Sequence, residues 1–194
     1  MDNQVLSSRS APLLAYIGLN DIGDLRAGAI SIYRFVEAFL TQLFAQEANL
    51  VANDFVDKAS KADQFKQEIE IIALELLQNV ACYSSLNYGE LLAYRHDGEL
   101  YLQSSNPISR GRQLDFKQWL STIKSSDYHH VWQQQIMGNY ENNAGKYTSR
   151  LGLIAMLKDL PISLDVAFRS VKSECQVLVT ICYHRFSFPV KANR

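Results

Sequence analysis

The stretch 71–80 constrains this chain most, because it is apolar on almost every side of a helix. Glu75 is its only charged residue, and no other charge occurs between Glu70 and Glu90. A helix that is apolar nearly all round is normally buried, and a lone carboxylate in it is costly to ionise without a partner. Asn79 follows Glu75 by four residues and therefore lies above it on the same helical face. A carboxylate and a carboxamide placed together suit holding a hydrated divalent cation and orienting a nucleophile.

The rest of this helix indicates which face enters the core. Projected at about 100° per residue, its main apolar stripe consists of Phe65, Ile69, Ile72, Leu76 and Val80. Glu68, Glu75 and Asn79 flank that stripe on one side. The polar pair is therefore expected at the margin of the core. There it either takes part in chemistry or is a buried polar pair that caps a neighbouring loop or hydrogen-bonds internally.

The composition is that of an ordinary globular domain. With 194 residues, 47% hydrophobic and 20% charged, the chain is long enough for one domain with a proper core. We expect a single domain over 1–194, with its core at about 13–188 and tails at 1–12 and 189–194. The net charge of −1 gives no reason to expect nucleic acid or an anionic membrane as a partner. No apolar run approaches the ~20 residues of a membrane span, and no signal peptide is visible, so cytoplasmic residence is expected.

Cysteine and histidine give no metal signature in the sequence. Cys82, Cys175 and Cys182 are an odd number without metal-type spacing. Cys175 and Cys182 fall in an apolar, strand-like segment, so buried reduced thiols are the favoured interpretation for these two. The four histidines are scattered, without zinc-type spacing, at His96, His129, His130 and His184. The chain also has no P-loop and no G-x-S-x-G motif, which excludes the enzyme classes that those motifs define.

Hydrophobic periodicity predicts the element order β-α-α-β-β-α-α-α-β-β. The clearest signal is a hairpin at Asp97-Gly98, because an Asp-Gly pair separates two apolar runs there. Polar loops are expected at 104–112 and 141–150. Strands are expected at 13–19, 91–94, 100–102, 162–170 and 175–188, and helices at 25–50, 62–85, 114–125, 127–140 and 151–160. Hairpins separated by groups of helices indicate an α+β fold, a two-layer sandwich with helices on one face of a largely antiparallel sheet.

Two short motifs resemble those of a known superfamily. The run ELLQNVACYS at 75–84 resembles the N-box of GHKL ATPases and kinases, whose core is E-x-x-x-N. The run SRLGLI at 149–154 resembles their G-x-G-L-G-L nucleotide-binding box at the start of a helix. More closely, the chain resembles the SiaB family of bacterial protein kinases from roughly residue 25 to 187. The N-box run, the strand with its SSNPI loop and the LGLI helix start occur in the family's order and at its spacing.

The resemblance implies a Bergerat-type, GHKL ATPase-like α/β sandwich with a mixed, mostly antiparallel sheet. It also implies phosphorylation, dependent on ATP and Mg²⁺, of a Ser or Thr on a small SiaC-like regulator. That regulator controls a diguanylate cyclase, and through it cyclic-di-GMP signalling and biofilm formation. Asn79 matches the Mg²⁺-binding Asn, and Glu75 matches the acid that positions or deprotonates the attacking group. Gly152 matches a glycine of the last box, where backbone N–H groups can cradle phosphate.

Two boxes depart from the superfamily's pattern. Its adenine box reads D-x-G-x-G, whereas this chain has SSNPI at 104–108, with Asn106 assigned to the nucleotide site and no carboxylate to accept from an adenine amino group. In the last box Arg150 stands where a small glycine is usual, so its guanidinium either obstructs the site or grips phosphate. Lys146 and Arg150 could close over a triphosphate as a lid, or they are ordinary charges on a solvated loop.

Two functions therefore remain open. The first is a kinase in which Glu75 is catalytic, Asn79 holds the metal, and the nucleotide is bound by Asn79, Asn106, Lys146, Arg150 and Gly152. The second is a degenerate GHKL domain that binds its partner without chemistry. The helix expected at 25–50 could also take part in a partner interface or a homodimer, because it is apolar on more than one face. Its main stripe is expected at Ile30, Tyr33, Val36, Leu40, Leu43 and Phe44.

Overall fold

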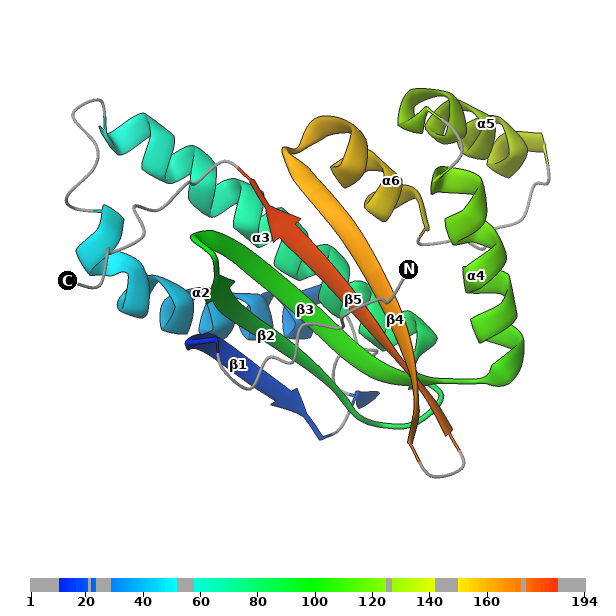
Figure 1. Ribbon diagram of the computed structural model, residues 1–194, viewed down its shortest axis with the longest axis horizontal. Helices are drawn as coiled ribbons and strands as arrows, with labels where there is room; N and C mark the ends of the chain where they lie inside the picture. The colour runs from blue at the N-terminus through cyan, green and yellow to red at the C-terminus, as the bar shows by residue number, and fades with distance from the viewer. Residues whose placement is uncertain are drawn as a thin grey trace.

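The structure is a computed structural model that describes residues 11–20, 22–23, 29–51, 58–124, 127–141, 150–171 and 174–184. Its elements are β1 (Leu13–Leu19), α2 (Ala29–Val51), α3 (Lys58–Tyr83), β2 (Gly89–His96), β3 (Glu99–Ile108), α4 (Arg110–Lys124), α5 (Tyr128–Glu141), α6 (Arg150–Asp159), β4 (Ile162–Val171) and β5 (Glu174–Tyr183). The fold is α+β, and the elements follow the order predicted from the sequence (Figure 1). The predicted tails, apart from residues 11 and 12, lie outside the described residues.

Five strands form one sheet in the order β1-β2-β3-β5-β4. All four ladders between described residues are antiparallel, so the predicted mixed sheet is wrong. The reason is that β5 returns between β3 and β4 and runs opposite to both. The β2–β3 hairpin turns at Asp97 and Gly98, whose φ angles of 50° and 83° both lie in the left-handed region. This is the two-residue turn that the Asp-Gly pair predicts.

The helices cover the sheet from one side. Helices α2 and α3 lie behind the sheet in Figure 1, and α4, α5 and α6 gather at one end of the molecule. The predicted stripe of α3 is confirmed, because all five of its residues are buried. The predicted stripe of α2 is wrong in part, since Tyr33 is 51% exposed. Among the side chains of α2 that the structure describes, those of residues 32–46, the buried ones are Ile32, Val36, Phe39 and Leu43. No helix among the described residues combines the length and apolarity that crossing a membrane requires.

The segment predicted as a loop at 104–112 is strand and helix instead. Strand β3 continues to Ile108 and keeps its register with β5 to that point. The loop prediction failed because three polar side chains are buried within the sheet, those of Ser104, Ser105 and Asn106. Helix α4 then begins after a single residue, and the Ser109 hydroxyl accepts from the Arg112 backbone N–H at 3.4 Å. Ser109 is therefore the N-cap of α4.

A buried polar contact fixes how α3 sits on the sheet. The Tyr183 hydroxyl of β5 donates to the Glu68 carboxylate, and both side chains are buried. The other Glu68 oxygen accepts from Gln64 Nε2 at 2.9 Å. Because a buried charge without partners is strongly unfavourable, this arrangement specifies one rotation of α3 about its axis. The same rotation directs Glu75, about two turns further along, toward the start of α6.

Candidate functional site

Helix α3 presents Glu75 and Asn79 together at the margin of the core. The Asn79 amide nitrogen donates to the Glu75 carboxylate at 3.0 Å and to the Glu75 backbone carbonyl at 2.8 Å. Both side chains are half-buried. Burial raises the pKa of Glu75 from its ordinary 4.5 to about 6, although the hydrogen bond from Asn79 opposes part of this rise. A carboxyl with such a pKa can take up and release a proton close to neutral pH.

The Glu75 carboxyl group lies directly against Gly152, the third residue of α6. A methyl group at position 152 would overlap both carboxyl oxygens, so α6 can approach α3 this closely only with glycine here. The first N–H groups of a helix have no partner within the helix and favour negative charge. The start of α6 is therefore suited to an anionic group beside Glu75.

A pocket of about 180 Å³ lies beside this pair, where α3, α4, α6 and the sheet meet. Its walls are mainly apolar, and its lining residues are Asn79, Tyr83, Ile108, Arg112, Asp115, Phe116, Leu153, Val177 and Val179. The Arg112 guanidinium lies 5.4 Å from the centre of the Tyr83 ring and donates to the Cys82 carbonyl at 3.0 Å. An apolar pocket with a few polar groups on one side is the usual form of a small-molecule site.

Asn106 lies next to this pocket on β3, two residues before the pocket residue Ile108. It projects from the same face of β3 as Ile108, which lines the pocket, because the two are separated by one residue. Asn106 is only 3% exposed, and its amide nitrogen donates to the Pro107 carbonyl at 3.3 Å. Its assignment to a nucleotide site stays a prediction.

The two basic residues predicted as a lid are not placed by the structure. Lys146 lies outside the described residues. Arg150 is the first residue of α6, but its side chain is also outside what the structure describes. The structure thus brings Gly152 to the Glu75–Asn79 pair, from which it is separated by more than seventy residues in the sequence.

Sequence reasoning missed Tyr83 and Asp115 of the pocket and favoured a solvated loop for Arg112 over a place in a nucleotide pocket or a partner surface. Arg112 lies instead in α4, and the polar run before it hid the start of that helix. Tyr83 follows Asn79 by four residues, so the series Glu75, Asn79, Tyr83 could have been recognised as one helical face. Asp115 lies within the helix predicted at 114–125, but no motif in the sequence assigns it to a site.

These features define the class of protein, a two-layer α+β domain. In it a Glu–Asn pair on a core helix lies against a glycine in the first turn of a second helix, beside an apolar pocket. No protein-family profile and no curated protein sequence matches the chain. Among solved structures, a chain of the SiaB–SiaC complex from Pseudomonas aeruginosa matches with a TM-score of 0.57 and 15% identity. The match covers 94% of this chain and 98% of that chain. The protein is therefore SiaB-like in its fold.

Proposed function

We propose that the protein is an ATP-dependent serine/threonine protein kinase of the SiaB type. Its substrate would be a small SiaC-like regulator in a pathway that controls cyclic-di-GMP signalling and biofilm formation. The observation that carries the proposal is the meeting of Glu75 and Asn79 with the start of α6 at Gly152, beside an apolar pocket. The SiaB-like fold supports the choice of substrate, because the similar structure is a complex with SiaC.

The residues of the site fit Mg²⁺ and a nucleotide. Asn79 and Glu75 offer oxygen atoms, the ligands that Mg²⁺ prefers, and Asn79 also lines the pocket. The start of α6 offers backbone N–H groups to phosphate, while the apolar walls suit a purine ring. Bound ATP would supply the phosphoryl group, and Mg²⁺ would neutralise its charge.

The raised pKa of Glu75 and its place against the start of α6 support a role in which it orients the substrate hydroxyl and accepts its proton. Asn79 holds the Glu75 carboxylate through its amide nitrogen, so one helix face would set both the metal and the base. Arg112, held by Tyr83 and the Cys82 carbonyl, is a fixed positive charge at the pocket wall. Because phosphoryl transfer depends mostly on positioning and charge neutralisation, these three side chains would supply most of the rate.

The decisive variant is Asn79→Ala. We expect it to abolish phosphate transfer to a SiaC-like protein and the Mg²⁺-dependent part of binding to a non-hydrolysable ATP analogue, measured by calorimetry. The matched control is Gln67→Ala, an exposed polar side chain on the same helix, which should leave both unchanged. Full transfer activity in a folded Asn79→Ala protein would remove Asn79 from the mechanism.

A second function, a scaffold that binds a SiaC-like partner without chemistry, is favoured by one observation. The segment 104–108 has no carboxylate, and Asn106 is buried with its amide donating to the adjacent backbone. A scaffold would bind the partner equally well without ATP and when Glu75 is replaced by alanine. Calorimetry would then detect no binding of the ATP analogue, even at millimolar concentration. Mg²⁺-dependent analogue binding would exclude this second function.

A further inference from the structure

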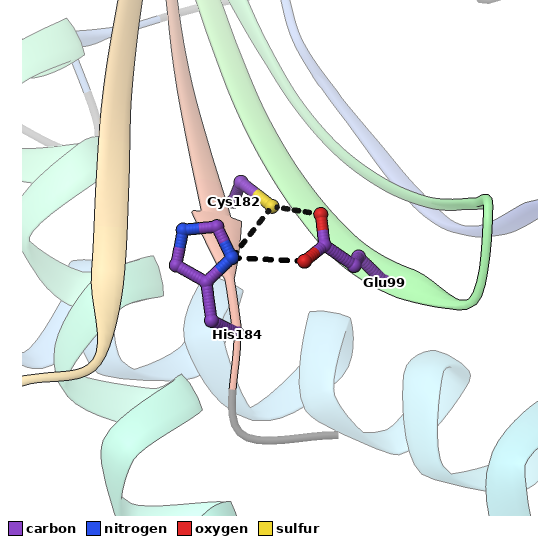
Figure 2. A group of neighbouring side chains, drawn as sticks. All are labelled: Glu99, Cys182 and His184. Carbon is purple, nitrogen blue, oxygen red and sulfur yellow. Dashed lines mark hydrogen bonds and ion pairs between the residues drawn. The ribbon is translucent and has the colours of Figure 1, made fainter. Parts of the chain in front are cut away.

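Three potential metal ligands converge at one end of the sheet, away from the site described above. The thiol of Cys182 lies 2.9 Å from one Glu99 carboxylate oxygen and 3.6 Å from His184 Nδ1. His184 Nδ1 lies 2.9 Å from the other Glu99 oxygen. Figure 2 shows the three side chains turned toward one another, from the start of β3 and from the end of β5.

The register of the sheet explains why they meet. Leu100 of β3 pairs with Tyr183 of β5, and both are buried in the core under the helices. Successive side chains of a strand point to opposite faces. Glu99, Cys182 and His184 are the immediate neighbours of this inward pair, so all three project from the face that the core does not use. Glu99 lies more than eighty residues before Cys182 and His184, and this separation hides the cluster from any spacing rule.

The chemistry of the three donors is that of a zinc site. Sulfur from Cys, nitrogen from His and oxygen from Glu are the ligand types that Zn²⁺ takes, in tetrahedral geometry. Zinc–ligand bonds of about 2.0–2.3 Å place neighbouring donors roughly 3.3–3.7 Å apart. The observed separations of 2.9–3.6 Å approach this spacing, so about half an ångström of side-chain movement would admit the ion.

Two further contacts hold the donors in a ligating orientation. Ser163 on β4 lies 2.9 Å from His184 Nε2, which fixes the ring and directs Nδ1 at the other two donors. The Tyr101 hydroxyl donates to Glu99 at 3.1 Å. Such outer contacts to ligating His and carboxylate groups are typical of metal sites. The side chain of His184 is 43% exposed, which gives an ion access from solvent.

We propose that Glu99, Cys182 and His184 form a Zn²⁺ site whose fourth position is left to water or to an incoming ligand. Three protein ligands with an open position distinguish such a site from a closed structural one. On binding, the S–H bond of Cys182 breaks, its proton goes to solvent and the thiolate sulfur donates to the metal. In the metal-free protein that proton is retained, because burial and the contact with Glu99 raise the pKa of the Cys182 thiol to about 12.

The test uses Co²⁺ as a spectroscopic substitute for Zn²⁺ on the full chain. We expect a single equivalent of Co²⁺ to produce visible bands of tetrahedral intensity and a thiolate-to-cobalt charge-transfer band. Excess Zn²⁺ should abolish both. His184→Ala should weaken Co²⁺ binding by at least tenfold, and Cys182→Ser should remove the charge-transfer band. The matched controls are Cys175→Ser and His129→Ala, which change the same residue types outside the cluster and should leave the titration unchanged.

A second measurement covers the case in which Cys182→Ser does not fold. Zn²⁺ should raise the midpoint of thermal unfolding of the native chain and of His129→Ala, because an ion that binds the folded state stabilises that state. It should not raise the midpoint of His184→Ala, which lacks one of the three ligands. His184 is partly exposed, so we expect its replacement to leave the fold intact. The proposal is overturned if the native chain shows no charge-transfer band, or if His184→Ala binds Co²⁺ as the native chain does.

Discussion

Glu75 is a carboxyl group enclosed between its own helix and the first turn of α6, where the amide of Asn79 is its hydrogen-bond donor among the described residues. Enclosure removes water from the charged form, and a single neutral hydrogen bond does not replace it. That is why its pKa rises to about 6 even though Asn79 donates to it. The enclosure that makes Glu75 a suitable base therefore also lowers the stability of the folded chain when Glu75 is ionised.

The first prediction concerns the pH dependence of stability, measured without divalent cations. The Glu75 carboxyl has a higher pKa in the folded chain, about 6, than its ordinary 4.5, so between these values the folded state binds more protons than the unfolded state. The contribution of Glu75 to the free energy of unfolding is greatest below pH 4.5. It falls as the pH rises from 4.5 to about 6 and is constant at higher pH. Glu75→Gln should thus be more stable than the native chain by about 2 kcal/mol at pH 7, from 1.4 kcal/mol per pKa unit. Urea unfolding should show this difference shrinking toward pH 4, and a constant difference would contradict the assignment.

The second prediction concerns Gly152. Gly152→Ala should destabilise the chain by about 1–3 kcal/mol, because the new methyl group overlaps the Glu75 carboxyl. In a Glu75→Ala background the same change should be neutral or stabilising, since alanine is the better helix former. Gly111→Ala is the matched control on α4, where nothing lies within 4 Å of the added methyl group. Additive effects of the two substitutions in a double-mutant cycle would show that the two residues do not touch.

At the scale of elements, the third prediction tests how α3 is fixed to the sheet. Tyr183→Phe removes the hydroxyl that donates to the buried Glu68 carboxylate. Leaving a buried charge with one partner fewer should cost about 1–3 kcal/mol of the free energy of unfolding. Tyr128→Phe, on an exposed tyrosine of α5, should cost less than about 0.5 kcal/mol. Urea denaturation measures both, and equal small effects would show that core packing alone orients α3.

The elements also show what the sequence could and could not predict. The α3 stripe and the Asp97-Gly98 hairpin were predictable because each depends on local pattern or on a turn that few residue types can form. The end of β3 was not, because its buried polar residues resemble a loop until β5 pairs with them. For the site, the Glu75–Asn79 pair follows from helical spacing. The contact of this pair with Gly152 joins residues that are far apart in the sequence. A motif resemblance can suggest such a contact, but hydrophobic periodicity cannot predict it.

At the scale of the whole molecule, the sheet separates two sets of polar groups. Glu75 and Asn79 belong to the helix layer, whereas Glu99, Cys182 and His184 project from the opposite face. Tyr183 connects the two layers, because it follows Cys182 on β5 and its hydroxyl donates to Glu68 on α3, the helix that carries Glu75 and Asn79.

The last prediction is that the two proposed sites bind independently. Effects at sites with no shared partner usually add, and the metal ligands contact neither α3 nor the pocket through any hydrogen bond described above. His184→Ala should therefore leave Mg²⁺-dependent binding of the ATP analogue unchanged, and Asn79→Ala should leave the Co²⁺ titration unchanged, both measured by calorimetry. The native chain titrated with analogue in the presence and absence of Zn²⁺ is the direct control. A tenfold change in either affinity, about 1.4 kcal/mol of coupling, would contradict independence and would mean that the contact between Tyr183 and Glu68 transmits metal binding to α3.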